Sequence, residues 1–275
     1  MKNAAISPEG RGIPAKLSTS SRVIGVDAET ATVTLENGQI VQGDFVIGAD
    51  GVHSVTRKGV AGRDIKPHSS GKSAFRFLIS RKVAQDDPVT AKVVQAPGEL
   101  IIWYGADRRV VVYPTTNNQL LNFVCIHPEA ESEAGSDGWN KRASLDQMLK
   151  IYEGFDPAIV ALISKADEES LKAWTLLDME VMSTWVKGKL ALLGDAAHPF
   201  TPHQGQGAGQ AIEDAASLAV VFPLDSKKEE ITARLELFEK IRKERADRIQ
   251  EYSRIAGSDL KEGVKNDSRC SSLLD

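Results

Sequence analysis

The chain has 275 residues, of which 41% are hydrophobic and 26% are charged, a composition typical of a globular protein with one or two domains. The formal net charge of −4 gives no indication of binding to nucleic acid or to an anionic membrane surface. No apolar run approaches the ~20 residues that span a bilayer, and the first residues lack the apolar core of a signal peptide. One cysteine lies in an apolar run (Cys125) and one in a polar tail (Cys270), which predicts free thiols and a reducing, cytoplasmic compartment.

Short β-strands are predicted for the first part of the chain, over residues 17–48. The runs VIGVDAE, ATVTLENG and QIVQG alternate partly between apolar and polar residues, and Asn37-Gly38 is a typical hairpin turn. The following run, DFVIGAD at residues 44–50, is nearly all apolar and ends on small residues. Such a run is typical of a central strand in a parallel sheet.

A second β-rich region is predicted over residues 73–126. Five runs separated by turn residues (SAFRFLIS, AKVVQA, ELIIWYG, RRVVVYP and LLNFVCI) indicate a mainly antiparallel sheet. The polar stretch at 128–144 then predicts an exposed loop. Short helices follow over 144–173, with Ser144 as one N-cap and Asp156-Pro157 as the start of a second helix.

The last third of the chain returns to a strand and then to helices. KLALLGD at residues 189–195 predicts a strand, and a glycine-rich turn leads from it into a helix over 208–222. A final helix is predicted over 227–256. Its apolar residues recur at helical spacing and are expected to pack in the core: Ile231, Leu235, Phe238, Ile241, Ile249 and Tyr252.

The first motif with chemical content is GADGVHSVTR at residues 48–57, where the apolar strand ends. Ligands of open α/β sheets bind beyond the carboxyl ends of such strands, where small residues let them approach the backbone. Asp50 is suited to accept from hydroxyl groups beside Gly51, and Arg57 to donate to a phosphate or carboxylate. The alternative is a tight structural turn in which the Asp50 side chain is satisfied by its own loop.

The second motif is LLGDAAHPFTPHQGQGAGQ at residues 192–210. An apolar strand again ends in Gly-Asp, and a loop with two prolines leads to a helix that opens on glycines. Unpaired amides at a helix start favour an anion or a carbonyl oxygen. A purely structural strand-turn-helix does not need this density of glycines, so the motif predicts a flat ligand lying against the main chain.

Together the two motifs resemble the Asp-Gly and Gly-Asp motifs of the FAD-dependent aromatic-ring monooxygenases, the group that includes p-hydroxybenzoate and salicylate hydroxylases. The segment GDAAHPFTPHQGQGAGQAIEDAASLA, at residues 194–219, is most similar to the salicylate-hydroxylase-like branch. The resemblance implies an α/β (α+β) fold with a long C-terminal helix. A Rossmann-like FAD-binding domain would comprise residues 1–72 and 174–275, and a mainly antiparallel substrate-binding sheet would comprise 73–173.

The resemblance also implies which residues contact the flavin. Asp195, after Gly194, would bind ribose or ribityl hydroxyls of FAD, and the Asp50-Gly51 turn would support the pyrophosphate side. Pro202 would lie beside the ring where oxygen is activated. A helix start facing the pyrimidine edge would stabilise the reduced, anionic flavin, and the residues implied there are Gly205, Gly207, Ala208 and Gly209. NADH or NADPH would be the co-substrate.

The substrate implied is a phenolic or polyketide-like small molecule, bound on the sheet side. Arg76 resembles an arginine that holds a phenolate or carboxylate, with a salt-bridged edge residue as the alternative. Tyr104 is a candidate for orienting a hydroxyl, with strand packing as the alternative. His203 is a candidate proton relay or a loop-fixing residue, whereas His198 is expected to pack the turn.

The sequence departs from the family pattern at its start, where the Gly-x-Gly-x-x-Gly motif of a βαβ unit is absent. The resemblance therefore predicts that about one nucleotide-binding lobe is missing. Three explanations stay open: an incomplete sequence, an inactive relative, or a short protein that uses the remaining cavity without flavin, as an isomerase or cyclase.

Overall fold

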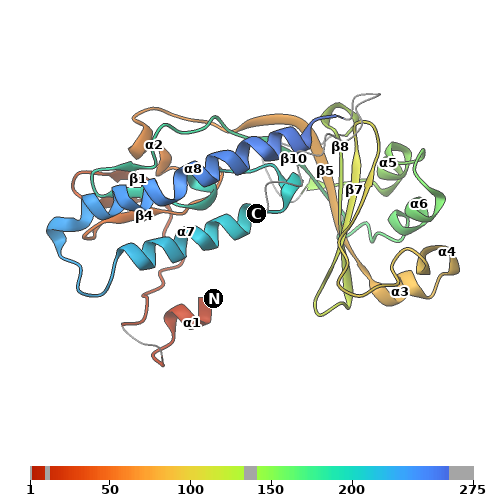
Figure 1. Cartoon of the computed structure of the whole chain (residues 1–275), viewed down its shortest axis with the longest axis horizontal. Coiled ribbons are helices and arrows are strands. Elements are labelled where there is room, and N and C mark those ends of the chain that lie inside the picture. The colour runs from red at the N-terminus through yellow and green to blue at the C-terminus, as the bar shows by residue number, and fades with distance from the viewer. Residues whose placement is uncertain (1, 10–12, 133–140, 260–275) are drawn as a thin grey trace. The chain divides into compact units, whose positions relative to one another are not determined.

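The computed structural model describes residues 2–9, 13–132 and 141–259, and the chain divides into two compact units (Figure 1). Unit 1 comprises the described residues within 1–66, 180–199 and 206–248. Unit 2 comprises those within 67–179, 200–205 and 249–259. The expected substrate domain, 73–173, falls inside the main segment of unit 2. The loop 200–205 and the end of the last helix also belong to unit 2, although the sequence had placed them in the cofactor domain.

Unit 1 contains two three-stranded sheets and the helices that follow them. Its elements are α1 (Lys2–Ile6), β1 (Val23–Asp27), β2 (Thr32–Leu35), β3 (Ile40–Gln42), β4 (Val46–Gly48), α2 (Arg57–Ala61), β11 (Val186–Lys187), β12 (Leu190–Leu192), the 3₁₀ turn η2 (Gly194–Ala196), α7 (Gly207–Val221), η4 (Lys228–Glu230) and most of α8 (Ile231–Gly257).

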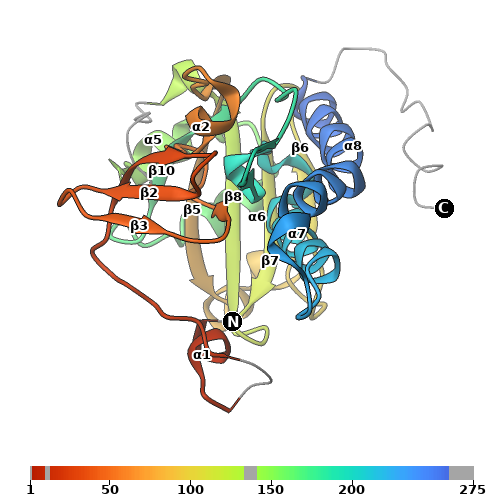
Figure 2. The ribbon, with the colours of Figure 1, turned by 90° about the vertical axis from the view of Figure 1, so that its left-hand side faces the viewer.

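The short strands predicted at the start of the chain form the first sheet of unit 1, which is antiparallel with the order β1-β2-β3 (Figure 2). The Asn37-Gly38 hairpin turn is confirmed: Gly38 has a φ of +83°, and its amide donates to the carbonyl of Leu35 at 2.9 Å. The Asn37 side chain accepts from the amide of Gln39 at 3.0 Å. Turn chemistry alone therefore fixes this connection.

The second sheet has the order β11-β12-β4, and β12 runs parallel to β4. The predicted parallel strand at residues 44–50 is thus confirmed in direction, but its central position is wrong, because β4 is an edge strand among the described residues. The side chains of Val46 and Ile47 are accordingly half-buried, whereas Leu190, Ala191 and Leu192 on β12 are fully buried.

Helices α7 and α8 confirm the two long helices predicted at the end of the chain, and they run side by side in unit 1 (Figure 1). The predicted apolar stripe of α8 holds at Ile231, Leu235 and Phe238, which are buried. It is wrong at Ile241, which is 50% exposed, while the neighbouring Arg242 is only 4% exposed. A charged residue therefore occupies the buried face of this helix.

Unit 2 is built on a six-stranded antiparallel sheet of order β6-β7-β8-β5-β10-β9. Figure 1 shows its short helices together on one face of this sheet. The elements are β5 (His68–Ser80), α3 (Arg81–Gln85), α4 (Pro88–Ala91), β6 (Ile101–Tyr104), β7 (Arg109–Thr115), β8 (Leu120–Pro128), η1 (Glu129–Glu131), β9 (Lys141–Arg142), α5 (Leu145–Ile151), α6 (Pro157–Ile163), β10 (Lys172–Asp178) and η3 (Pro202–Gln204).

Two helix starts in unit 2 confirm the predicted caps. The hydroxyl of Ser144 accepts from the amide of Gln147 at 3.3 Å, and the carboxylate of Asp156 accepts from the amide of Ala158 at 2.7 Å. Each side chain satisfies an amide that the helix itself leaves unpaired. Pro157 occupies the first helical position, where its missing N–H has no cost.

One strand prediction in this region is wrong, and one loop prediction differs at two short segments. Residues 91–96 (AKVVQA) do not form a strand, because Asp87 caps helix α4 through the amide of Val89 and Pro88 begins that helix. The predicted loop at 128–144 contains η1 and the short strand β9. Residues 133–140 of that loop lie outside the described residues, as does Cys270, whereas Cys125 is free and buried.

The main core of unit 2 lies between the sheet and its helices. Along β5 the side chains of Phe75, Phe77 and Ile79 are buried on this face, and Arg76 and Leu78 point to the opposite face. Leu162 and Ile163 of α6 close the core from the helical side. One face of the sheet is thus covered by the short helices, and on the opposite face Ala74, Ile126 and Leu176 form a second, smaller buried cluster. Across the described residues, no helix is both long and apolar enough to cross a bilayer.

His127 lies at the edge of this core and gives it a predicted pH dependence. The ring stacks on Phe75 at 4.5 Å, and its Nε2 lies 2.7 Å from the hydroxyl of Ser132. Desolvation lowers the pKa of His127 from 6.5 to about 4. Between these two pKa values the unfolded chain binds a proton and the folded chain does not. The contribution of neutral His127 to the free energy of unfolding is therefore fully present above pH 6.5 and is lost as the pH falls from 6.5 to about 4.

We expect the wild-type chain to lose about 2 kcal/mol more stability between pH 7 and pH 5 than the His127→Phe variant, which cannot titrate there. Urea unfolding of both proteins at the two pH values measures this difference. Equal losses in the two proteins would show that His127 is protonated as readily in the folded chain as in the unfolded chain.

Candidate functional site

The two predicted ligand motifs follow the carboxyl ends of two neighbouring parallel strands. Strands β4 and β12 are parallel neighbours, with Gly48 paired to Leu192, and the amide of Leu193 donates to the carbonyl of Gly48 at 2.9 Å. Gly48 is needed here because a Cβ would lie 2.1 Å from the hydroxyl of Thr56. Parallel strands present their carboxyl ends together, so Asp50 and Asp195 follow adjacent strand ends.

Asp50 is satisfied by its own loop. Its Oδ1 accepts from the hydroxyls of Ser54 and Thr56 at 2.6 and 2.7 Å, and its Oδ2 accepts from the amides of Val55 and Thr56 at 2.8 and 3.0 Å. Burial raises the pKa of the Asp50 carboxyl, but these hydrogen bonds outweigh it, so the pKa is lowered overall. The self-satisfied turn is therefore what the structure contains. Gly51 has a φ of +81°, and a Cβ on it would meet no atom within 4 Å.

Arg57 joins the two strand ends from inside. Only 1% of the residue is exposed, and its Nε donates to the carbonyl of Ala196 at 2.8 Å. One terminal nitrogen donates to Asp195 O and Gly51 O at 2.9 and 3.3 Å, and the other to Ile65 O at 3.2 Å. These partners are backbone carbonyls instead of the phosphate or carboxylate expected from the sequence. Because the guanidinium is buried, Arg57 acts as a brace between the motifs.

Asp195 contrasts with Asp50. Its side chain is exposed, and within the described part of the chain no group donates a hydrogen bond to its carboxylate. Desolvation of the carboxyl raises the pKa of Asp195 above its ordinary value, against the opposing charges of His198 and Arg57. The carboxylate therefore retains its acceptor capacity for a ligand that carries hydroxyl groups.

Helix α7 begins next to the Gly194-Asp195 turn. Gly194 has a φ of +60°, and a Cβ on it would lie 3.2 Å from the Cβ of Ala211, on the second turn of the helix. The first helical amides, at Gly207, Ala208 and Gly209, precede that contact by one turn, and the N-cap residue supplies no side-chain hydrogen bond. A helix start with unpaired amides carries partial positive charge, which favours an electron-rich edge of a ligand.

The glycines of this region fit a flat cofactor with hydroxyl groups, such as FAD. Gly209 has ordinary helical backbone, and the nearest atom to a Cβ on it would be Gln206 Oε1 at 3.9 Å. Alanine at this position would favour the helix, and nothing in the described chain excludes it. The position is therefore open for a ligand to approach the backbone of the helix that packs against Gly194 at Ala211. Donor amides, open glycines and one unsatisfied carboxylate are together the groups that such a cofactor requires.

The remaining residues of the second motif belong to unit 2. Pro202 begins η3, and Gly205 ends it with a φ of +64°. The ring of His203 packs against Gly257, where a Cβ would lie 2.5 Å from the imidazole. Desolvation, followed by the nearby charges of Arg109 and Lys72, lowers the pKa of His203 to about 4, so its imidazole is neutral at pH 7.

A polar pocket of about 480 Å³ lies within unit 2 beside His203. Three buried polar atoms in its wall have no hydrogen-bond partner among the described residues: Ser70 Oγ, Thr201 Oγ1 and His203 Nδ1. Thr201 is only 5% exposed. Buried hydroxyl and imidazole groups are rarely left without a partner, so this pocket is suited to a polar ligand or to water.

Arg76 and Tyr104 lie on the face of the unit 2 sheet opposite the short helices. The register aligns Tyr104 with Arg109 across β6 and β7, and Arg76 with Val124 across β5 and β8. The guanidinium of Arg76 lies 5.6 Å from the ring centroid of Trp174, and its Nε donates to the Asn122 side chain at 3.3 Å. Arg76 is exposed, and its contacts with Trp174 and Asn122 involve no charged side chain, so the salt-bridged alternative is not what the described residues contain.

Tyr104 is 56% exposed and lies under Arg109, whose guanidinium is 5.3 Å from the centroid of its ring. The strand-packing alternative is therefore weak for this residue, because little of the side chain is covered. Arg109 also donates to the carbonyl of Ser258 at 2.9 Å. Its charge acts on His203, so the three residues Tyr104, Arg109 and His203 form one electrostatic group within unit 2.

Sequence reasoning missed the residues that support these groups. Arg109 lies in a run that was assigned only to a strand and Thr201 in the predicted loop, and Lys72 directly precedes the predicted sheet and was given no role. Asp214 and Arg242 form a buried ion pair at 2.8 Å, and the sequence placed them in the two last helices without a role. A signal for Arg242 was present, because it lies four residues after Phe238 on the buried stripe of α8.

Comparison with known proteins defines the class to which this fold and site belong. A family model described as an FAD binding domain matches residues 16–253, which include both motifs and most of both units. A solved structure of a salicylate hydroxylase substrate complex superimposes with a TM-score of 0.79 at 30% identity, covering 95% of this chain and 67% of that one.

Curated relatives include the FAD-dependent monooxygenase atnJ of Arthrinium sp, which is 34% identical over 86% of this chain. Hispidin-3-hydroxylase of Neonothopanus nambi is 30% identical over 90% of this chain. The chain spans 55% of the first relative and 61% of the second. It belongs to the FAD binding domain family of aromatic-ring monooxygenases, and the resemblance noted in its sequence is confirmed.

Proposed function

We propose that this chain forms the ribityl and isoalloxazine side of an FAD-dependent monooxygenase that hydroxylates a phenolic or related small molecule with NAD(P)H and O2. The observation that carries the proposal is the pair of parallel strand ends at β4 and β12, where Asp195 presents a free carboxylate beside the start of α7. Relatives whose names specify FAD-dependent oxygenation, and one named as a hydroxylase of hispidin, support it.

Each flavin contact has a separate role in this proposal. When FAD is bound, Asp195 would accept from its ribose or ribityl hydroxyls, and the amides of Gly207, Ala208 and Gly209 would bind the pyrimidine edge of its ring. Pro202 would contact the ring, and the turn at Asp50-Gly51 would support the pyrophosphate. FAD supplies the redox chemistry when bound, by taking electrons from NAD(P)H and activating O2, and the protein orients it and excludes water.

Unit 2 supplies the substrate side. Arg76, which is exposed on the sheet face opposite the short helices, binds a phenolate or carboxylate, and Tyr104 orients a substrate hydroxyl. His203 is neutral at pH 7 and is therefore able to accept a proton from a phenol hydroxyl at its ring nitrogen. The pocket beside it, with unpartnered Ser70 and Thr201 hydroxyls, accommodates polar substituents of the substrate.

A turnover assay tests this function. The chain is incubated with FAD, NADH or NADPH, O2 and a panel of phenols and hydroxybenzoates. We expect substrate-stimulated oxidation of the nicotinamide cofactor and a product one oxygen atom heavier than the substrate. Conversion of a substrate without flavin would instead favour an isomerase or cyclase on the same scaffold. A folded chain that turns over nothing in the panel would count against catalysis by this chain.

A cytoplasmic location is part of the proposal. The buried free thiol of Cys125 supports it, because a reducing compartment keeps such thiols unpaired.

A further inference from the structure

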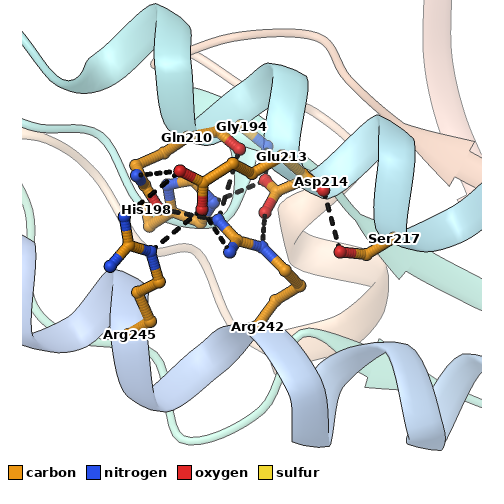
Figure 3. Close-up of polar contacts among 8 residues, drawn as sticks. All are labelled: Gly194, His198, Gln210, Glu213, Asp214, Ser217, Arg242 and Arg245. Carbon is orange, nitrogen blue, oxygen red and sulfur yellow. Dashed lines mark hydrogen bonds and ion pairs between the residues drawn. The ribbon is translucent and has the colours of Figure 1, made fainter.

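A buried network of charged and polar side chains joins α7, α8 and the turn at η2 in unit 1 (Figure 3). Asp214 and Gln210 on α7 are fully buried, His198 after η2 is 1% exposed, and Arg242 on α8 is 4% exposed. Burying charged groups is costly unless each of them is paired and hydrogen-bonded. Each buried charged group of this network therefore needs defined partners.

Asp214 is at the centre of the network. Its Oδ2 accepts from the backbone amide of Gly194 at 3.0 Å and lies 2.7 Å from Nε2 of His198. Its Oδ1 accepts from Nε of Arg242 at 2.8 Å. The Asp214 carboxylate thus contacts the backbone of the Gly194-Asp195 turn, the His198 side chain that follows the turn, and Arg242 on the neighbouring helix α8.

Arg242 is held in turn by a second set of partners on α7. Its terminal nitrogens donate to Gln210 Oε1 and Glu213 Oε2, both at 2.6 Å. Glu213 also accepts from Arg245 at 2.9 Å, at the surface of unit 1. The guanidinium therefore has its plane fixed by three side chains, and it holds the Asp214 carboxylate in one orientation.

The position of Asp214 along the chain connects this network to the flavin contacts. Gly194 directly precedes Asp195, so the bond from the Gly194 amide to Asp214 holds the backbone next to the Asp195 side chain. Asp214 lies on α7, two turns after the helix start at Gly207. A single carboxylate therefore links the free Asp195 carboxylate to the helix whose first amides face the ligand.

Replacing a buried ion pair with apolar residues is often neutral for stability, so stability alone does not explain such a network. Its direct bond to the amide of Gly194 points to a geometric role. We infer that Asp214, oriented by Arg242 and His198, is a positioning residue that holds the Gly194-Asp195 turn and the start of α7 in the arrangement that binds the flavin. This inference rests on the proposed function, because it assigns Asp195 to the cofactor.

The Asp214→Asn variant tests the inference, with Leu235→Ala as a matched control. Asparagine has the size of aspartate but places an amide donor against the donors of Gly194, His198 or Arg242. Leu235 is fully buried on α8 and belongs to no part of the network, so its truncation destabilises unit 1 without changing the turn. A merely structural role for Asp214 would make the two variants behave alike.

Two measurements are made on the full chain under conditions in which all variants are folded. Amide hydrogen exchange followed by mass spectrometry reports on the peptide that covers residues 193–198, and quenching of flavin fluorescence gives the Kd for FAD. We expect Asp214→Asn to accelerate exchange in that peptide about tenfold and to weaken FAD binding about tenfold, as for loss of a hydrogen bond to a charged group. Leu235→Ala should change both by less than about twofold.

Exchange in residues 193–198 that is no faster in Asp214→Asn than in Leu235→Ala overturns the inference. If the wild-type chain binds no FAD, the proposed function fails, and the exchange comparison still decides whether Asp214 holds the turn. If Asp214→Asn does not fold, Arg242→Lys replaces it. Lysine keeps the charge but loses the fork that orients Asp214, so a smaller acceleration in the same peptide supports the inference and none contradicts it.

Discussion

The Asp195→Ala variant is expected to bind FAD about 10- to 100-fold more weakly than the wild-type chain, with little change in the stability of the chain alone. The loss of affinity follows from removing a charged acceptor for hydroxyl groups, which is typically worth about 1.5–3 kcal/mol. The unchanged stability follows from the structure, because no described residue donates to this exposed carboxylate. Fluorescence titration with FAD and urea unfolding measure the two quantities.

Arg76→Ala is the matched control for this variant. Arg76 lies on the sheet of unit 2 and is assigned to the substrate, so its truncation should leave the Kd for FAD within about twofold and mainly reduce turnover. Equal losses of FAD affinity in the two variants would contradict both role assignments. Asp50→Ala provides a further contrast, since it removes the acceptor of four loop hydrogen bonds and should lower stability by about 2 kcal/mol.

Arg57→Met is expected to lower the free energy of unfolding by about 4 kcal/mol, the largest effect on stability that we predict for a single substitution in this chain. Methionine fills much of the same volume but leaves four backbone carbonyls without their donor, at Gly51, Ile65, Asp195 and Ala196. Desolvation lowers the pKa of Arg57, opposed by the nearby charges of Asp50, Asp195 and Asp64. Arg57 bonds to the backbone of both motifs, so we expect the Arg57→Met variant to lose FAD binding as well.

Two further variants show whether the fork geometry of Arg57 matters. Arg57→Lys keeps the charge, but a single ammonium group cannot reach carbonyls on both strand ends, so we expect about half of the loss to remain. Arg63→Met removes an exposed arginine whose ion pair with Glu180 lies at the surface, and it should change stability by less than about 1 kcal/mol. A fully stable Arg57→Met protein would show that the two strand ends are held together by other contacts.

Local chemistry made much of this fold predictable from sequence. The hairpin at Asn37-Gly38 and the helix starts at Ser144 and Asp156 depend on side chains that bond to backbone within two or three residues. The strand predicted at 91–96 failed for the same kind of reason. Its apolar pattern was read without the cap at Asp87, and the cap decides where helix α4 begins.

The chemical roles of the two aspartates were less predictable. Asp50 and Asp195 both follow an apolar strand next to glycine, yet one is saturated by its loop and the other is free. The difference depends on how the hydroxyls of Ser54 and Thr56 fold back, which the motif alone does not specify. The Asp214–Arg242 pair joins two helices, and such pairs are visible in a sequence only as a charge on an otherwise buried stripe.

Titration of the wild-type chain with FAD tests the central claim most directly, since that claim is that the ends of β4 and β12 form a flavin site. We expect saturable binding of one FAD per chain at about 10 µM, with quenched flavin fluorescence and slowed hydrogen exchange at residues 193–198. A folded chain whose exchange at those residues and whose flavin signal are unchanged at about 100 µM FAD would contradict the claim.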